Sequence, residues 1–212
     1  MKRIIPFLAV LLIIFSSIPI TAYAVSSDYT YNILSDNTIE LTKYNGEEKA
    51  VEVPSQIDGY TVSKIGVSLF SGKNMTEVIL PDTINEIKPY ALSNNKLKEI
   101  IVPDSVITVG SFAFMYNSDL KQIYLGKNVS SLGERDFYRC TSLETIAVSP
   151  ENDYLSVNDG VLLCNNESEL VCYPSEKTGS YYKLRSYKTV KVDGMKTKMY
   201  SKYSKAKKIK LK

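Results

Sequence analysis

A repeated segment of about 23 residues constrains the fold more than any other feature of this sequence. Leu97, Leu120 and Leu143 occupy equivalent positions 23 residues apart, and Met75 precedes the first of them by 22. A single copy of such a segment cannot bury its apolar face, whereas stacked copies cover one another. The spacing therefore predicts a β-rich solenoid of roughly 23-residue coils. The copies read VEVPSQIDGYTVSKIGVSLF, MTEVILPDTINEIKPYALSNN, LKEIIVPDSVITVGSFAFMYN, LKQIYLGKNVSSLGERDFYRC and LETIAVSP.

Each copy begins with a short predicted strand. In Leu97-x-x-Ile100-x-Val102, Ile100 and Val102 alternate with Ile101, so the first two face the core and the third faces outward. Pro81 and Pro103 follow their strands directly and lack the N–H that would continue a ladder. Stacking of the copies then aligns these strands in parallel, as one long sheet on one face of the solenoid.

Later positions of the repeat also fall into columns. We expect Phe70, Leu92, Phe114 and Phe137 to stack inside, with Phe112 as a further apolar core position. Glycines recur at one position and suit a tight backbone turn. A third column holds polar or thiol groups that can bond loop backbone inside the core. The glycine column is Gly66, Gly110 and Gly133, and the polar column is Asn95, Asn117 and Cys140.

The pattern L-x-x-I-x-[LV]-P…V…[IV]-G…[AS]-F…C…L resembles the BspA-like family of bacterial leucine-rich repeats. Residues 29–66 are similar to the N-terminal opening of that family, and 152–174 to a hairpin often inserted in it. The resemblance implies a leucine-rich repeat solenoid with an N-terminal capping hairpin. It also implies a surface protein that adheres to host proteins or neighbouring cells.

The chain divides into four predicted segments. Residues 1–24 have a basic start, an apolar run from Phe7 to Phe15 and an Ala22-Tyr23-Ala24 ending, which is typical of a secretion signal. A membrane-spanning helix needs roughly 20 apolar residues, so an uncleaved N-terminal anchor is the weaker alternative. We expect a secreted or cell-surface protein without a transmembrane anchor in its mature chain. The other segments are a capping hairpin (25–50), a solenoid with an inserted hairpin near 160–174 (51–174) and a basic, degenerate last repeat (175–212).

Charge differs between the last segment and the two segments before it. Residues 25–174 contain 11 Lys+Arg and 21 Asp+Glu, whereas residues 175–212 contain 13 and 2. YSKYSKAKKIKL (200–211) keeps the apolar spacing of FYRCTSLETIAV (137–148), which predicts a last strand with Lys208 and Lys210 facing outward. The alternative is a cluster that contacts an anionic cell-wall polymer. Nucleic-acid binding fits poorly with a secretion signal. The candidate contacts are Lys205, Lys207, Lys208, Lys210 and Lys212.

The sequence gives little evidence of a catalytic site. The chain has no histidine, so Ser-His and Cys-His pairs are excluded. Its carboxylates do not follow the spacing of a calcium loop, and we expect no metal or cofactor. The cysteines Cys140, Cys164 and Cys172 are interpreted as small buried thiols, and pairing of the last two stays open. We expect no enzymatic activity.

The outward face of the predicted strands is the candidate partner-binding surface. It carries a mainly polar row and, beside it, an apolar row over consecutive repeats, and contiguous apolar surface often marks a partner site. Alternatively, one of the two hairpins or another copy of the chain covers it. The function predicted is recognition of a protein or glycan at a cell surface; the alternative is a structural or targeting module held on the producing cell's own wall. The rows are Glu77, Glu99, Gln122 and Thr145, and Ile79, Ile101, Tyr124 and Ala147.

Overall fold

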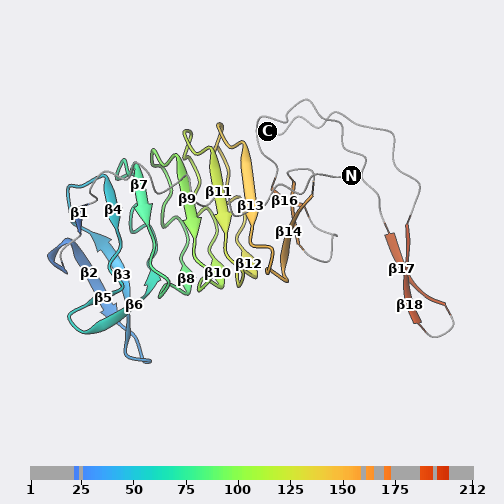
Figure 1. Cartoon of the computed structure of the whole chain (residues 1–212), viewed down its shortest axis with the longest axis horizontal. Helices are drawn as coiled ribbons and strands as arrows, with labels where there is room; N and C mark the ends of the chain where they lie inside the picture. The colour runs from blue at the N-terminus through green and yellow to red at the C-terminus, as the bar shows by residue number, and fades with distance from the viewer. Residues whose placement is uncertain are drawn as a thin grey trace, which may run out of the picture. The chain divides into compact units, whose positions relative to one another are not determined.

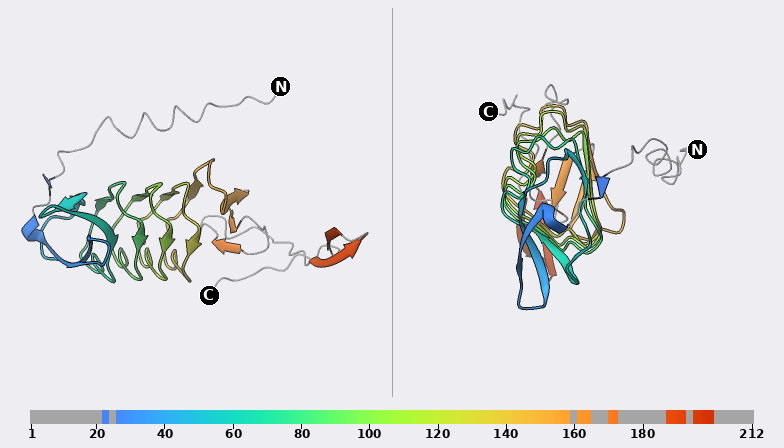
Figure 2. Two further views of the ribbon diagram at one scale, coloured as in Figure 1. Left: turned by 90° about the horizontal axis from the view of Figure 1, so that it is seen from below. Right: turned by 90° about the vertical axis from the view of Figure 1, so that its left-hand side faces the viewer.

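The computed structural model describes residues 22–23, 26–158, 161–164, 170–172, 187–192 and 195–200, with side chains for 27–157 and 161–163. The chain forms two units, residues 1–174 and residues 175–212. The first unit is the predicted solenoid, whose successive coils superimpose when viewed end-on (Figure 2).

The first side of the solenoid carries the predicted parallel strands. One ladder of hydrogen bonds joins β4 to β7, and a second joins β9, β11 and β13 in that order. Strand β7 lies beside β9 (Figure 1). Alternation within the strands is as predicted, because Ile100 and Val102 are buried and Ile101 is exposed. Pro81 and Pro103 follow these strands and accept the turn bonds from Ile84 N and Val106 N. The strands are β4 (Ala50–Glu52), β7 (Glu77–Ile79), β9 (Glu99–Val102), β11 (Gln122–Leu125) and β13 (Thr145–Val148).

A second side of the solenoid also carries strands, which the sequence did not predict. These strands continue into the N-terminal hairpin, in the order β12-β10-β8-β6-β3-β2. Lys64 pairs with Glu86, and Lys88 with Glu40, each at 2.6 Å across the outer surface of this sheet. The strands are β2 (Tyr29–Ile33), β3 (Thr38–Tyr44), β6 (Tyr60–Ile65), β8 (Glu86–Ile87), β10 (Thr108–Val109) and β12 (Ser131–Leu132); β5 (Gln56–Ile57) pairs with β6 alone.

The N-terminal hairpin closes one end of the solenoid, as predicted. It follows the 3-10 turn η1 (Ser26–Asp28), and β3 pairs in parallel with β6 while β2 occupies the sheet edge. Tyr29 and Tyr44 lie with their ring centroids 5.3 Å apart, and Tyr44 is 5.3 Å from Phe70 of the first coil. These rings cover the apolar end of the core, which would otherwise meet water.

Strand β1 (Ala22–Tyr23) precedes this hairpin and pairs in parallel with β4. It lies within the Ala22-Tyr23-Ala24 stretch that resembles a cleavage site. Residues 1–21 are outside the described part of the chain, so cleavage stays a prediction. If the chain is cleaved after Ala24, β1 is removed and β4 becomes the edge of its sheet.

The third side of the solenoid is built from turns that stack without strands. Phe70 N donates to Ala91 O, and Leu92 N to Ala113 O, so each turn bonds the next. Two positions in each turn adopt left-handed backbone, and most are not glycine. They are Ser68, Tyr90, Phe112 and Arg135 at the first position, with φ between 55° and 62°, and Gly72, Asn94, Tyr116 and Arg139 at the second, with φ between 54° and 68°.

The glycine column has a different role from the one predicted. Gly66, Gly110 and Gly133 are not among the residues with positive φ. A Cβ at Gly133 would lie 2.1 Å from Ser111 N, and one at Gly110 would lie 2.6 Å from Pro89 N. Glycine is therefore needed because the backbone of the preceding coil approaches too closely for any side chain.

Gly133→Ala is expected to lower the free energy of unfolding by about 2–3 kcal/mol, since backbone must move to admit the methyl group. Gly59→Ala is the matched control. Its φ is 85° but nothing lies within 4 Å of the added Cβ, so only the left-handed backbone costs energy, about 1 kcal/mol. Urea denaturation of both variants measures the difference. An equal or smaller loss for Gly133→Ala would contradict the close approach.

The predicted apolar column fills the core. Phe70, Leu92 and Phe114 are fully buried, and Phe114 stacks on Phe137 at 5.9 Å. The polar column has the predicted structural role. Asn117 Nδ2 donates to Leu92 O at 2.9 Å and Phe114 O at 2.7 Å, while its Oδ1 accepts from Leu97 N.

The other members of the polar column bond in the same way. Asn95 Nδ2 donates to Phe70 O and Leu92 O, and its Oδ1 accepts from Met75 N. Cys140 Sγ donates to Phe114 O at 3.2 Å, and burial raises the pKa of this free thiol to about 12. The column thus satisfies the carbonyl groups that each turn points inward.

After β13 the chain leaves the repeat for an antiparallel sheet. Its strands are β14 (Leu155–Asn158), β15 (Val161–Cys164) and β16 (Leu170–Cys172), so the hairpin expected near 160–174 corresponds to β15 and β16. The register places Cys172 opposite Leu162, and Cys164 opposite Leu155. The side chains of these two cysteines lie outside the described residues.

The structure describes two strands of the second unit, and the degenerate repeat expected over 175–212 stays a prediction. Strands β17 (Tyr187–Val192) and β18 (Met195–Tyr200) form an antiparallel pair with each other, unlike the parallel strands of a coil. Asp193-Gly194, the dipeptide between them in the sequence, is typical of a two-residue hairpin turn. Residues 201–212 lie outside the described residues.

Candidate strand-face site

The predicted partner-binding rows exist as aligned rows on the outer face of β7 to β13. Ladder partners are Glu99 with Gln122 and Ile101 with Tyr124. The ladder from β11 to β13 continues both rows to Thr145 and Ala147. Since parallel strands lie about 4.8 Å apart, each row presents one side chain every coil along a straight line.

The two rows differ in their exposure and chemistry. Ile101 is 48% exposed, whereas Ile79, Tyr124 and Ala147 are partly buried. Gln122 Nε2 donates to Glu99 Oε2 across the polar row, which holds that side-chain pair in place. The face can therefore offer an apolar strip bordered by fixed hydrogen-bonding groups.

The N-terminal hairpin does not form part of this face. Its strands extend the second sheet, next to β6. Ile101, at the centre of the apolar row, keeps half of its surface exposed in the described structure. On the first coil the rows continue to Ala50 and Glu52, which the sequence reasoning missed; their ladder partners are Glu77 and Ile79.

The candidate lysines at the C-terminus cannot be compared with this face. Lys205, Lys207, Lys208, Lys210 and Lys212 all lie outside the described residues. The last strand, predicted with Lys208 and Lys210 facing outward, lies there too. Contact of these lysines with an anionic polymer stays a prediction.

Two further features of the solenoid were not predicted from the sequence. The first is Phe112, which was assigned to the core but is partly exposed and stacks on Tyr90 at 4.9 Å. The alignment of Phe112 with Tyr90 and Arg135 in one column was the available signal, because a core column would not contain arginine.

The second missed feature is a buried carboxyl group. Asp136 is 3% exposed and occupies the column of Ala91 and Ala113. Its Oδ1 accepts from Ala113 N at 3.1 Å, while Oδ2 has no hydrogen-bond partner. Burial raises the pKa of Asp136 to about 7, although backbone N–H groups of Ala113, Gly133 and Phe112 partly oppose this rise.

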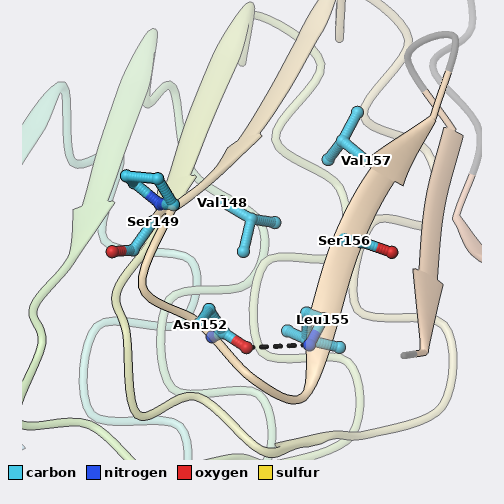
Figure 3. Close-up of a pocket in the computed structure, with 7 residues that line it drawn as sticks. Val148, Ser149, Asn152, Leu155, Ser156 and Val157 are labelled. Carbon is cyan, nitrogen blue, oxygen red and sulfur yellow. Dashed lines mark hydrogen bonds between the residues drawn. The ribbon is translucent and has the colours of Figure 1, made fainter. Parts of the chain in front are cut away.

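A hollow of about 270 Å³ lies between the end of β13 and β14 (Figure 3). Asn152 holds its shape, since its Oδ1 accepts from Leu155 N at 2.7 Å and its Nδ2 donates to Gly126 O. None of the lining residues is charged, so the hollow offers nothing to an ionic ligand. It marks the point where the stacking of coils stops. The lining residues are Val148, Ser149, Pro150, Asn152, Leu155, Ser156 and Val157.

Within the part of the chain that the structure describes, no three His, Cys, Asp or Glu side chains gather as metal ligands. No helix among the described residues is long and apolar enough to cross a bilayer.

Residues 49–158 match the family described as BspA type leucine rich repeat region, in six copies. The chain therefore belongs to the BspA-type leucine-rich repeat proteins, whose repeats typically serve as binding modules without catalysis. The resemblance drawn from the repeat pattern is confirmed. No curated protein shows significant similarity to the chain.

Several solved bacterial leucine-rich repeat structures are similar to the chain. One from Eubacterium ventriosum is 22% identical with a TM-score of 0.50, and the match covers 71% of this chain and half of that protein. One from Bacteroides capillosus is 26% identical with a TM-score of 0.49, covering 57% and 94%. A leucine rich cell surface protein from Faecalibacterium prausnitzii is 22% identical with a TM-score of 0.32, covering 75% and 62%. At this level of identity the Eubacterium structure supports the fold alone.

Proposed function

We propose that the chain is a secreted or cell-surface recognition protein that binds a protein or glycan of a host or neighbouring cell through its strand face. The observation that carries the proposal is the aligned pair of rows on β7 to β13, with Ile101 half-exposed at its centre. The signal-like residues 1–24 support export. The repeat family supports binding over catalysis.

The rows suit recognition because they are rigid. Each outward side chain is fixed by a strand whose inward neighbours, such as Ile100 and Ile123, are almost fully buried. A preformed surface loses little conformational entropy on binding, so modest contacts suffice for affinity. Partly buried Tyr124 adds an aromatic group with a hydroxyl, a type common at the centre of interfaces.

The test replaces Ile79, Ile101 and Tyr124 together by serine in the mature full-length chain. Binding to a panel of immobilised extracellular-matrix proteins and glycans is expected to weaken by at least about tenfold, because the apolar strip is lost. The control replaces three exposed apolar residues, Ile33, Val67 and Ile107, which lie off the strand face. Circular dichroism establishes that both variants fold.

A second candidate function is association with the producing cell's own wall through the basic end. It is favoured by the charge contrast between 25–174, with 11 basic and 21 acidic residues, and 175–212, with 13 and 2. Retention on purified wall that disappears at moderate salt, equally in both triple variants, would support this candidate. It would also count against the strand face as the binding surface.

A further inference from the structure

A cluster of aromatic and arginine side chains runs along the third side of the solenoid. We name it the aromatic–arginine ridge. It belongs to the turns of three consecutive coils, each of which follows a strand of the second sheet and precedes the next strand of the strand face. Its members are Tyr90, Phe112, Tyr116, Arg135, Tyr138 and Arg139.

The ridge residues are not required by the backbone that carries them. The first coil adopts the same left-handed turn with Ser68 and Gly72, and Asn94 fills one position of the second coil. Glycine and asparagine tolerate left-handed backbone, whereas a bulky side chain there costs on the order of 1 kcal/mol. Later coils nonetheless place Tyr116 and Arg139 at the second position, and Phe112 and Arg135 at the first.

Burial of these side chains does not offset the energetic cost of the left-handed backbone. Tyr90 is 38% and Tyr116 46% exposed, and both arginines are exposed. Strained backbone that displays large exposed side chains is a feature of functional surfaces. The arrangement therefore favours a role for these side chains outside the fold.

The side chains of the ridge contact one another in the chain alone. Tyr90 and Phe112 stack with their rings 9° from parallel, and Tyr116 meets Tyr138 edge-on at 5.9 Å. The guanidinium carbons of Arg139 and Arg135 lie 5.5 Å and 5.9 Å from the centre of the Tyr138 ring. These contacts restrict side chains that would otherwise lose entropy on binding.

The chemistry of the ridge favours an anionic partner. The ion pairs found among the described residues, Lys64–Glu86 and Lys88–Glu40, lie on the second sheet, so neither ridge arginine is neutralised by a carboxylate. Exposed Glu134 forms no ion pair with them, and Asp136 is buried. The ring edges carry partial positive charge.

The same contacts favour a peptide over a sugar. Sugar rings stack on free aromatic faces, but stacking takes one face each of Tyr90 and Phe112, and the arginines flank Tyr138, so fewer faces are left for a sugar. Arg139 also bonds the Tyr138 side chain, and the remaining N–H groups of both arginines can bond a carboxylate, which guanidinium binds with two parallel hydrogen bonds. Arginine and tyrosine are also the residues most enriched at the centres of protein interfaces.

We propose that the aromatic–arginine ridge is a second interaction surface, which binds an acidic segment of a partner protein through Arg135, Arg139 and the tyrosine hydroxyls beside them. This surface is independent of the strand face, so the failure of either proposal leaves the other standing.

The test measures fluorescence anisotropy of a labelled decapeptide of alternating Glu and Gly, titrated with the mature full-length chain at physiological salt. Arg135→Gln with Arg139→Gln is expected to weaken binding roughly tenfold, through the loss of charge-assisted bonds. Tyr116→Ser leaves the net charge unchanged and is expected to weaken binding about threefold, because a hydroxyl contact and its aromatic support are lost.

The matched control is Lys43→Gln with Lys49→Gln, which removes two exposed charges from the N-terminal segment. The basic segment 175–212 is the same in every variant, so it cannot cause a difference between the arginine pair and the lysine pair. Equal weakening by the arginine and lysine pairs would overturn the proposal, since binding would then follow net charge alone. Arginine-dependent binding of a heparin-derived oligosaccharide, with no arginine-dependent binding of the peptide, would also overturn it.

Discussion

Asn117→Ala is expected to lower the free energy of unfolding by about 3–5 kcal/mol, a large share of the stability of a domain this size. The substitution removes three hydrogen bonds to buried backbone groups. Leu97 N loses its acceptor, while Leu92 O keeps only the bond from Asn95 and Phe114 O keeps only the bond from Cys140. Asn117 is fully buried, so water cannot replace the side chain without opening the coil.

Two further variants separate this bonding role from a general loss of side-chain volume. Asn117→Cys is expected to cost less than Asn117→Ala, since Cys140 fills the same column and donates to Phe114 O. Asn128→Ala removes an exposed amide that donates to Asp104 O, and is expected to cost about 1 kcal/mol or less. Urea unfolding gives all three values. Comparable losses for Asn117→Ala and Asn128→Ala would contradict the structural role of the column.

Asp136→Asn is expected to remove a pH dependence that the wild-type chain carries in its stability. The pKa of Asp136 is raised by burial to about 7, from 3.8. Between these two values the folded chain holds a proton that the unfolded chain has released, so stability falls as pH rises from about 4 to about 7. The loss from this one group is on the order of 3–4 kcal/mol across that range.

Unfolding by urea at pH 4.5, 6, 7.5 and 9 measures this effect. The difference between wild type and Asp136→Asn should change by that amount over the series, with the variant relatively more stable at high pH. Asp104→Asn, at an exposed carboxylate, is the control and should leave the wild-type slope intact. Parallel curves for wild type and Asp136→Asn would contradict the buried, titrating carboxyl group.

Periodicity explains why the solenoid could be predicted. Columns such as Phe70, Leu92 and Phe114 repeat in both type and spacing, and only stacked coils bury all of them. Alternation around Ile100 and Ile101 was enough to orient β9, and therefore the strand face. The inward role of Asn95 and Asn117 followed from their place beside the apolar column.

Other features of the solenoid could not be predicted from the sequence. Strands β8, β10 and β12 have two residues each, too few to show alternation. The glycine column was visible, but its cause is the neighbouring coil, which a single repeat does not contain. Most left-handed turn positions hold tyrosine, phenylalanine or arginine, so the usual glycine or asparagine signal appears only at Gly72 and Asn94.

The C-terminal segment combines two sequence signals. Apolar residues recur in 200–211 at the offsets of a repeat, which stays a prediction, whereas 187–192 and 195–200 pair as an antiparallel hairpin. Asp193-Gly194 between two alternating segments is the stronger local signal, because it specifies a two-residue turn. Matching offsets carry less weight, since lysine and tyrosine occupy most of the matched region.

The central claim is that the strand face of β7 to β13 recognises a partner. Its most direct test compares three full-length chains on the same immobilised panel: wild type, the serine triple at Ile79, Ile101 and Tyr124, and the control triple at Ile33, Val67 and Ile107. The structure predicts that wild type and control bind the same panel member with equal affinity, while the strand-face variant binds at least about tenfold more weakly. Equal binding by the two triple variants would contradict it.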